Sequence, residues 1–165
     1  FITLRDFFNK GFKNLAQNTA HFGFSLLILS ILFNSLFSSE IITNLKVGQT
    51  FENTKTKIVF ESISQKEAKN YRSIIGNFTV QDSKGKIENL SPELRIYNQP
   101  NITTSEADIK TTLLSDKFIV INIVQNQEFF NVRYQVKPFM LWIWISVILI
   151  SFGGLISFLK KGYEK

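Results

Sequence analysis

The apolar stretch AHFGFSLLILSILFNSLF, residues 20–37, decides the fold expected for this chain. It contains no Asp, Glu, Lys or Arg. As a helix that rises about 1.5 Å per residue it would be about 27 Å long, which is close to the thickness of the hydrocarbon core of a bilayer. The sequence therefore predicts a first transmembrane helix within residues 18–38.

His21 is the one histidine of the chain, and it lies inside this apolar stretch. An ionisable side chain in a membrane is costly unless it is paired, ligated or neutral. The residue alone leaves two interpretations open. A neutral imidazole can be hydrogen-bonded to a backbone carbonyl or to a Ser or Thr hydroxyl of a neighbouring helix, or it can be an axial ligand of a haem iron. Gly23 is then expected to leave room for a large planar ligand, and a bis-histidine site would need a histidine from outside the chain.

A second apolar stretch, residues 138–159, predicts another transmembrane helix. Trp142 and Trp144 near its start are typical of an interfacial aromatic belt, and haem stacking is the alternative. Gly153-Gly154 lowers the local bulk and favours close helix approach. In the first span, Ser30 and Asn34 are expected to face protein rather than lipid, because hydrogen bonds between helices suit them better.

Residues 1–17 precede the first span. Helical spacing places Leu4, Phe8, Phe12 and Leu15 on one face, which predicts an amphipathic helix at the membrane surface. A short linker that packs on other helices is the alternative.

Residues 39–137 have the character of a β-rich soluble domain. Runs of β-branched residues alternate in part between apolar and polar side chains. Asp82-Ser83-Lys84-Gly85 is typical of a hairpin turn, and NQPN at 98–101 is expected to end a strand. The expected strands cover residues 56–63, 73–81, 86–90, 94–97, 117–124 and 129–136. The predicted fold class is a membrane α + β protein in which two transmembrane helices flank a small antiparallel β barrel or sandwich.

The charge distribution predicts the orientation of these segments. The chain has a net charge of +6, of which residues 1–19, residues 160–165 and the long middle each carry +2. Basic residues at the ends of two spans favour the cytoplasm or the mitochondrial matrix for residues 1–17 and 160–165. The β domain is then expected in the periplasm or the intermembrane space, and His21 near the cytoplasmic or matrix end of its span. No basic stripe indicates nucleic-acid binding.

The residue inventory excludes most autonomous enzyme chemistry. The chain has no cysteine and one histidine, so it can form neither a disulfide nor a thiolate metal site, and it lacks the residues of a cysteine nucleophile or a cluster of histidine ligands. No glycine-rich phosphate loop or HExxH motif is present. Catalysis by this chain alone is not expected.

A succession of short motifs runs from about residue 18 to residue 159. They are Ala20-His21-Phe22-Gly23, Asn70-Tyr71, GNFTV at 76–80, LSPELRIYNQPNITTSEADI at 90–109, Arg133-Tyr134, Lys137-Pro138, Trp142-Ile143-Trp144 and Gly153-Gly154-Leu155. In this order the motifs resemble the C-terminal part of CcmF, the membrane haem lyase of cytochrome c maturation, which is related to NrfE.

The resemblance implies a role for His21. In that family a histidine in the helix before the last periplasmic domain is one axial ligand of a transmembrane haem b, and a second histidine comes from an earlier helix. His21 matches that position, with Phe22 where a leucine is common. The haem b is thought to reduce the incoming haem, so that the CXXCH thiols of apocytochrome c can add to its vinyl groups.

The Trp-rich haem-handling loop of the family and its flanking histidines are absent from these 165 residues. The resemblance therefore implies a companion CcmF polypeptide, as where the gene is split, or a longer chain of which this is a part. The haem chaperone and apocytochrome c are the further partners implied, and the inner membrane the location. Two other hypotheses compete with this one: a non-catalytic accessory subunit of a respiratory-membrane complex, in which His21 is only hydrogen-bonded, and a transporter accessory protein.

Overall fold

The computed structural model describes the backbone of residues 4–124 and 128–163, and the side chains of residues 15–124 and 128–159. It contains two compact units. A helical unit consists of the chain up to Ser38, the segment Thr112–Ser115 and the chain from Lys137 onward. A β unit consists of Ser39–Thr111 and Asp116–Val136.

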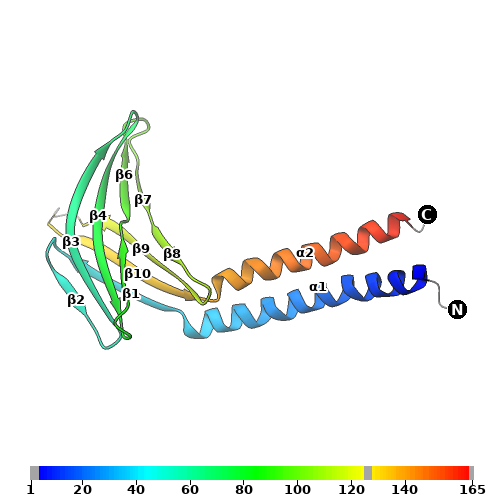
Figure 1. Ribbon diagram of the computed structural model, residues 1–165. Coiled ribbons are helices and arrows are strands. Elements are labelled where there is room, and N and C mark those ends of the chain that lie inside the picture. The colour runs from blue at the N-terminus through cyan, green and yellow to red at the C-terminus, as the bar shows by residue number, and fades with distance from the viewer. Residues whose placement is uncertain (1–3, 125–127, 164–165) are drawn as a thin grey trace. The chain divides into compact units, whose positions relative to one another are not determined.

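Two long helices form the helical unit (Figure 1). They are α1 (Leu4–Phe37) and α2 (Met140–Tyr163). The helices are antiparallel, because Gly153 of α2 lies beside Ala16 and Ala20 near one end of the pair, and Phe139 lies beside Phe33 at the other. Both ends of the described chain therefore lie at the same end of the helix pair, which agrees with the expectation that residues 1–17 and 160–165 lie on the same side of the membrane.

Apolar segments of α1 and α2 are each long enough to cross a membrane. They are Leu15–Phe37, with 23 residues, and Met140–Leu159, with 20 residues. Only 11% of each apolar window is buried inside the protein, so neither helix resembles the core helix of a soluble domain. The helical backbone of α1 is continuous from Leu4, but the side chains of Leu4, Phe8 and Phe12 lie outside the described residues, so the amphipathic face stays a prediction.

The β unit is an antiparallel sandwich of two sheets, which confirms the predicted fold class and selects the sandwich over the barrel. One sheet has the order β1-β10-β9-β8, and the other has the order β2-β3-β4-β6-β7, with β5 also paired to β4. The long curved hairpin of β3 and β4 is visible in Figure 1. The strands are β1 (Ser39–Leu45), β2 (Thr50–Glu52), β3 (Thr56–Glu67), β4 (Tyr71–Asp82), β5 (Ile87–Leu90), β6 (Glu93–Tyr97), β7 (Thr103–Glu106), β8 (Asp108–Thr111), β9 (Ser115–Ile123) and β10 (Phe130–Pro138).

All six predicted strands are present, and the Asp82–Gly85 turn joins β4 to β5 as expected. Gly85 has a φ of +79°, and its N–H donates to the carbonyl of Asp82. Four strands were not predicted: β1, β2, β7 and β8. β2, β7 and β8 have only three, four and four residues, which is too short for an alternation of apolar and polar side chains to be recognised. β1 has seven residues and directly follows the first apolar span.

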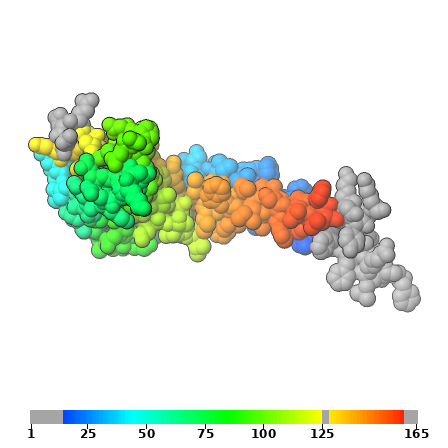
Figure 2. Space-filling view, turned by 90° about the horizontal axis from the view of Figure 1, so that it is seen from above, coloured from blue at the N-terminus to red at the C-terminus, as the bar shows by residue number. Residues whose placement is uncertain are grey.

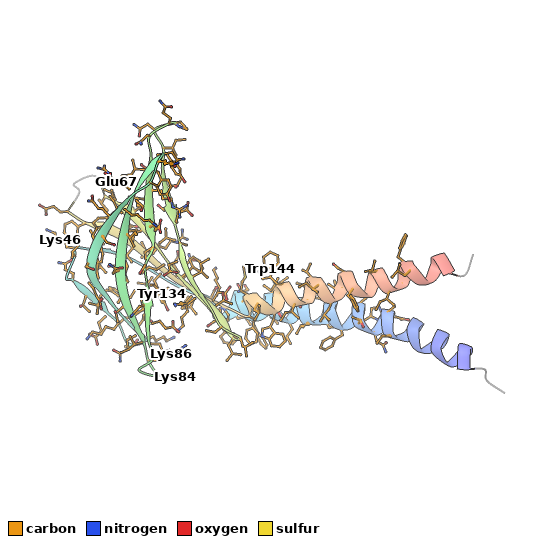
Figure 3. The ribbon with its side chains drawn as sticks, turned by 45° about the horizontal axis from the view of Figure 1, so that its top comes forward. Lys46, Glu67, Lys84, Lys86, Tyr134 and Trp144 are labelled. Atoms are coloured by element: carbon orange, nitrogen blue, oxygen red, sulfur yellow. The ribbon has the colours of Figure 1, made fainter. Side chains whose placement is uncertain are left out.

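Side chains from both sheets form the core of the sandwich. The ring of Phe60 stacks on Phe78 at 4.3 Å and meets the ring of Phe130 edge-on at 5.5 Å. Burial raises the pKa of Tyr134, which is 3% exposed and lies inside the sandwich (Figure 3), and the nearby charges of Glu88 and Asp82 raise it further. Close-packed aromatic pairs of this kind fix how the two sheets face each other.

An ionic cluster also links the two sheets. Lys117 Nζ of β9 lies 3.0 Å from Glu88 Oε2 of β5 and 3.6 Å from Asp82 Oδ2 of β4. Burial disfavours the ionised form of Glu88, but Lys86 and Lys117 outweigh it and hold the pKa of Glu88 below its usual value. The pKa of Asp82 is lowered too, because the backbone N–H groups of Lys86 and Lys84 and the charge of Lys117 outweigh burial.

Replacing Lys117 with methionine is expected to destabilise the sandwich by about 1–3 kcal/mol at pH 7, because it takes a partner from a carboxylate that is 9% exposed. A carboxyl group whose pKa is lowered by folding stabilises the folded state. This stabilisation is fully present above the pKa of the unfolded chain, about 4, and it is lost as the pH falls through the pKa of the folded state. The melting temperature of the wild type should therefore fall below about pH 4, and the melting temperature of K117M should depend less on pH in this window.

Circular dichroism of the full chain in detergent measures both effects. Lys110→Met is the matched control, since Lys110 is exposed on β8 and forms no ion pair with another described residue. Equal melting of K117M and K110M at pH 7 would contradict the stabilising role of the cluster.

Candidate functional site

His21 lies on the exposed surface of α1. It forms no hydrogen bond with any other residue whose side chain is described, so both ring nitrogens are available as far as this part of the chain goes. The apolar segment of α1 begins at Leu15, which is earlier than Ala20, where the apolar stretch in the sequence begins. His21 is therefore about 9 Å along the helix from the start of the apolar segment, at 1.5 Å per residue.

An open groove of about 430 Å³ adjoins His21 between the two helices. Ala16 and Ala20 of α1 line one side, and Gly153, Gly154 and Ser157 of α2 line the other. Gln17 and His21 of α1 complete the described lining, so the imidazole lies at a groove that is otherwise lined by small residues and one glutamine carboxamide. A flat apolar ligand that needs one nitrogen donor fits this chemistry.

Gly23 does not provide this space, which corrects the expectation from the sequence. A Cβ at Gly23 would lie 3.0 Å from Leu149 Cβ and from the N and Cγ1 atoms of Ile150. Gly23 is therefore used for helix packing. Gly154 provides the space instead, because a Cβ built there meets no atom within 4 Å.

Gly153 brings the two helices together, as the Gly-Gly pair predicted. A Cβ at this position would lie 2.8 Å from both the carbonyl oxygen of Ala16 and the backbone nitrogen of Ala20. The seam continues with small buried residues, since Gly23 and Ser30 of α1 and Ser146 of α2 are also buried. This seam was not predicted from the sequence, although the spacing of seven residues between Ala16, Gly23 and Ser30 indicates it.

Asn34 anchors the other end of the helix pair. Its Nδ2 donates to the carbonyl of Pro138 at 2.7 Å, which confirms that it faces protein. Phe139 has a φ of 57°, an unusual conformation for a residue other than glycine, and its ring packs against Phe33 at 5.1 Å. Its carbonyl accepts from the backbone N–H groups of Trp142 and Ile143, which starts α2.

Neither tryptophan lines the groove beside His21. Trp142 Nε1 donates to the carbonyl of Leu113 at 2.7 Å, and Trp144 projects away from the helix pair, 62% exposed (Figure 3). Both lie near the start of α2, and at 1.5 Å per residue Trp142 is about 16 Å and Trp144 about 14 Å along the helix from Gly153. This position fits an interfacial belt and leaves haem stacking at the groove unsupported.

The remaining surface of the helices is strongly apolar. The space-filling view in Figure 2 displays the outer face of α2 in orange. Such surfaces suit lipid or further transmembrane helices. The most exposed of the large side chains are Phe22, Leu36 and Phe37 on α1 and Ile148 and Phe158 on α2.

Comparison with known proteins places this architecture in a family. The family described as the CcmF C-terminal beta-sandwich matches residues 36–138, a range that does not include His21. The chain is 28% identical over 145 residues to the "Cytochrome c-type biogenesis protein CcmF" of Pseudomonas aeruginosa and 30% identical over 145 residues to ccl1 of Rhodobacter capsulatus, covering 88% of this chain and 22% of the relative in both cases. NrfE of Haemophilus influenzae is 26% identical over 148 residues, 88% of this chain and 23% of that protein.

A solved structure titled "Cytochrome c Heme Lyase CcmF" has the same fold, with a TM-score of 0.69 and 16% identity. The alignment covers 90% of this chain and 25% of the other, so both helices are included in large part. The chain thus spans between a fifth and a quarter of the length of these relatives. By its sandwich, its flanking helices and its motifs, the chain belongs to the CcmF family and corresponds to the C-terminal region of its members.

Proposed function

We propose that the chain is the C-terminal subunit or segment of a CcmF-type haem lyase and supports the covalent attachment of haem to apocytochrome c. The membership of the family carries this proposal. Because the chain spans 22% of the length of its relatives, the reaction needs residues that lie elsewhere. We assign those residues to a companion CcmF polypeptide or to another part of a longer chain.

Within this assembly His21 is one axial ligand of a transmembrane haem b. An exposed imidazole without a hydrogen-bond partner among the described residues supports the assignment, and it lies beside a groove lined by small residues and Gln17. These 165 residues hold no second histidine, so we assign the other ligand to the companion or to another part of a longer chain. When bound, this haem supplies an electron-transfer centre in the membrane.

The role of the chain's own residues is to position that ligand. The close contact of Gly153 with α1 fixes the spacing of the two helices, and the open side of Gly154 keeps the groove accessible next to His21. The apolar outer faces of the helices exclude water and provide surface for the helices of the companion. The sandwich is the proposed docking surface for the haem chaperone or apocytochrome c on the periplasmic or intermembrane-space side of the inner membrane.

Deletion of the chain tests this function. We expect c-type cytochromes, detected by their covalent haem in denaturing gels, to disappear, and a tagged copy of the chain to restore them. The tagged chain should co-purify with the companion polypeptide and give a b-type spectrum on reduction. Normal c-type cytochromes after deletion would overturn the proposal and favour a non-catalytic accessory subunit.

A further inference from the structure

The turn between β8 and β9, Thr112–Ser115, groups with the helices rather than with the sandwich that its flanking strands form. Its two central residues, Leu113 and Leu114, are 71% and 66% exposed. Both are among the most exposed large apolar side chains of the described chain. In Figure 2 the yellow-green atoms of this turn project beside the start of α2.

Hydrogen bonds attach this turn to the first turn of α2. Trp142 Nε1 donates to the carbonyl of Leu113 at 2.7 Å, and the N–H of Phe139 donates to the carbonyl of Leu114 at 2.9 Å. The leucine side chains are exposed while their carbonyls are bound, so the turn is held in place with its apolar surface outward.

Thr112 and Ser115, at the two ends of the turn, form hydrogen bonds with each other. The N–H of Thr112 donates to the carbonyl of Ser115 at 3.0 Å, and the N–H of Ser115 donates to Thr112 Oγ1 at 3.1 Å. Thr112 Oγ1 in turn donates to the carbonyl of Ser115 at 2.7 Å. Backbone groups that are already bonded lower the cost of moving a turn out of water.

We propose that Leu113 and Leu114 insert into the lipid of the membrane interface and act as a third anchor beside the two transmembrane helices. Lipid is the occupant because the turn is bonded to the start of an apolar helix, next to Trp142 and the outward-facing Trp144, where aromatic belts meet the headgroups. The exposed leucines therefore lie at the start of α2, which continues as an exposed apolar helix. Transfer of the two exposed leucine side chains from water into lipid, together with Trp142 and Trp144 at the interface, fixes the height of the turn at the membrane.

The absence of cysteine from the chain allows a direct test. Single cysteines at positions 113 and 114 are labelled with the environment-sensitive dye NBD, and the full chain is reconstituted in phosphatidylcholine vesicles. Ser83→Cys in the polar β4–β5 turn is the control. We expect labels at 113 and 114 to emit at shorter wavelength than the label at 83, to be quenched by lipids that carry a nitroxide on the acyl chain, and to show several-fold weaker quenching by aqueous iodide.

Two results would overturn the proposal. Iodide quenching at 113 and 114 equal to that at 83 would place the turn in water. Quenching by neither reagent would place it against protein. The variant Trp142→Phe combined with the cysteine at 113 removes one of the two attachments of the turn to α2, and iodide quenching of its label is expected to rise.

Discussion

A His21→Ala variant of the full assembly is expected to lose b-type haem while the chain continues to accumulate in the membrane. The imidazole is exposed and contributes no hydrogen bond to another described residue, so its removal takes nothing from the packing of α1. The loss of one of two axial ligands weakens haem binding, and a tenfold loss corresponds to about 1.4 kcal/mol. We expect the haem content of the purified assembly to fall about tenfold or more, and c-type cytochromes to fall with it.

The reduced-minus-oxidised spectrum of the purified assembly measures the haem directly. Phe22→Ala is the matched control, because Phe22 is the next residue and is 63% exposed. It should retain haem b. In a His21→Gly variant, added imidazole should restore part of the spectrum, because a free imidazole can occupy the vacated ligand position. An intact H21A assembly with full haem b would contradict the assignment.

The second large effect is expected for substitutions at the adjacent Gly153 and Gly154. Gly153 packs against α1, whereas Gly154 lies at the groove with no atom close to it, so the two positions test helix packing and the groove independently. In Gly153→Leu the new side chain meets the backbone of Ala16 and Ala20, since even its Cβ would lie 2.8 Å from both. Backbone atoms cannot rotate away, so the helices must separate. We expect a loss of about 1–3 kcal/mol or more from overpacking, with less chain in the membrane.

In Gly154→Leu the side chain extends into open space, so the stability of the helix pair should stay close to that of the wild type. The leucine fills part of the groove beside His21, however, so haem content should fall. Unfolding of the full chain in detergent, followed by circular dichroism, and haem content of the assembly distinguish the two variants. Equal haem content in G154L and the wild type would contradict a role for the groove.

The sequence was most informative where an element depends on its own residues. The two apolar spans could be recognised by length and by the absence of charge. The β4–β5 hairpin could be predicted because Gly85 is suited to the positive φ that the turn requires. The sequence was least informative for β1, β2, β7 and β8. β2, β7 and β8 have only three or four residues each, and β1 pairs with β10, which lies far away in the chain.

The candidate site too could be predicted from the sequence only in part. The sequence alone identified His21, because a single ionisable residue in an apolar span calls for a chemical explanation. It also pointed to Gly153-Gly154 as small. The sequence could not show that Gly153 packs against α1 while Gly154 lies beside open space. It also predicted that Gly23 leaves room for a ligand, whereas Gly23 packs against Leu149 and Ile150.

Sequence by itself therefore determined the fold class, the family resemblance and the candidate ligand His21. Only the tertiary structure decided that the groove beside His21 opens next to Gly154, that Gly153 and Gly23 close the helix pair, and that the turn at Leu113 belongs with α2. The physical reason is that apolar length and turn propensity are properties of one segment. A groove or a seam depends instead on the rotation of one helix against another, which is set by packing between residues more than a hundred positions apart. The turn at Leu113 depends on hydrogen bonds to Phe139 and Trp142, which come later in the chain.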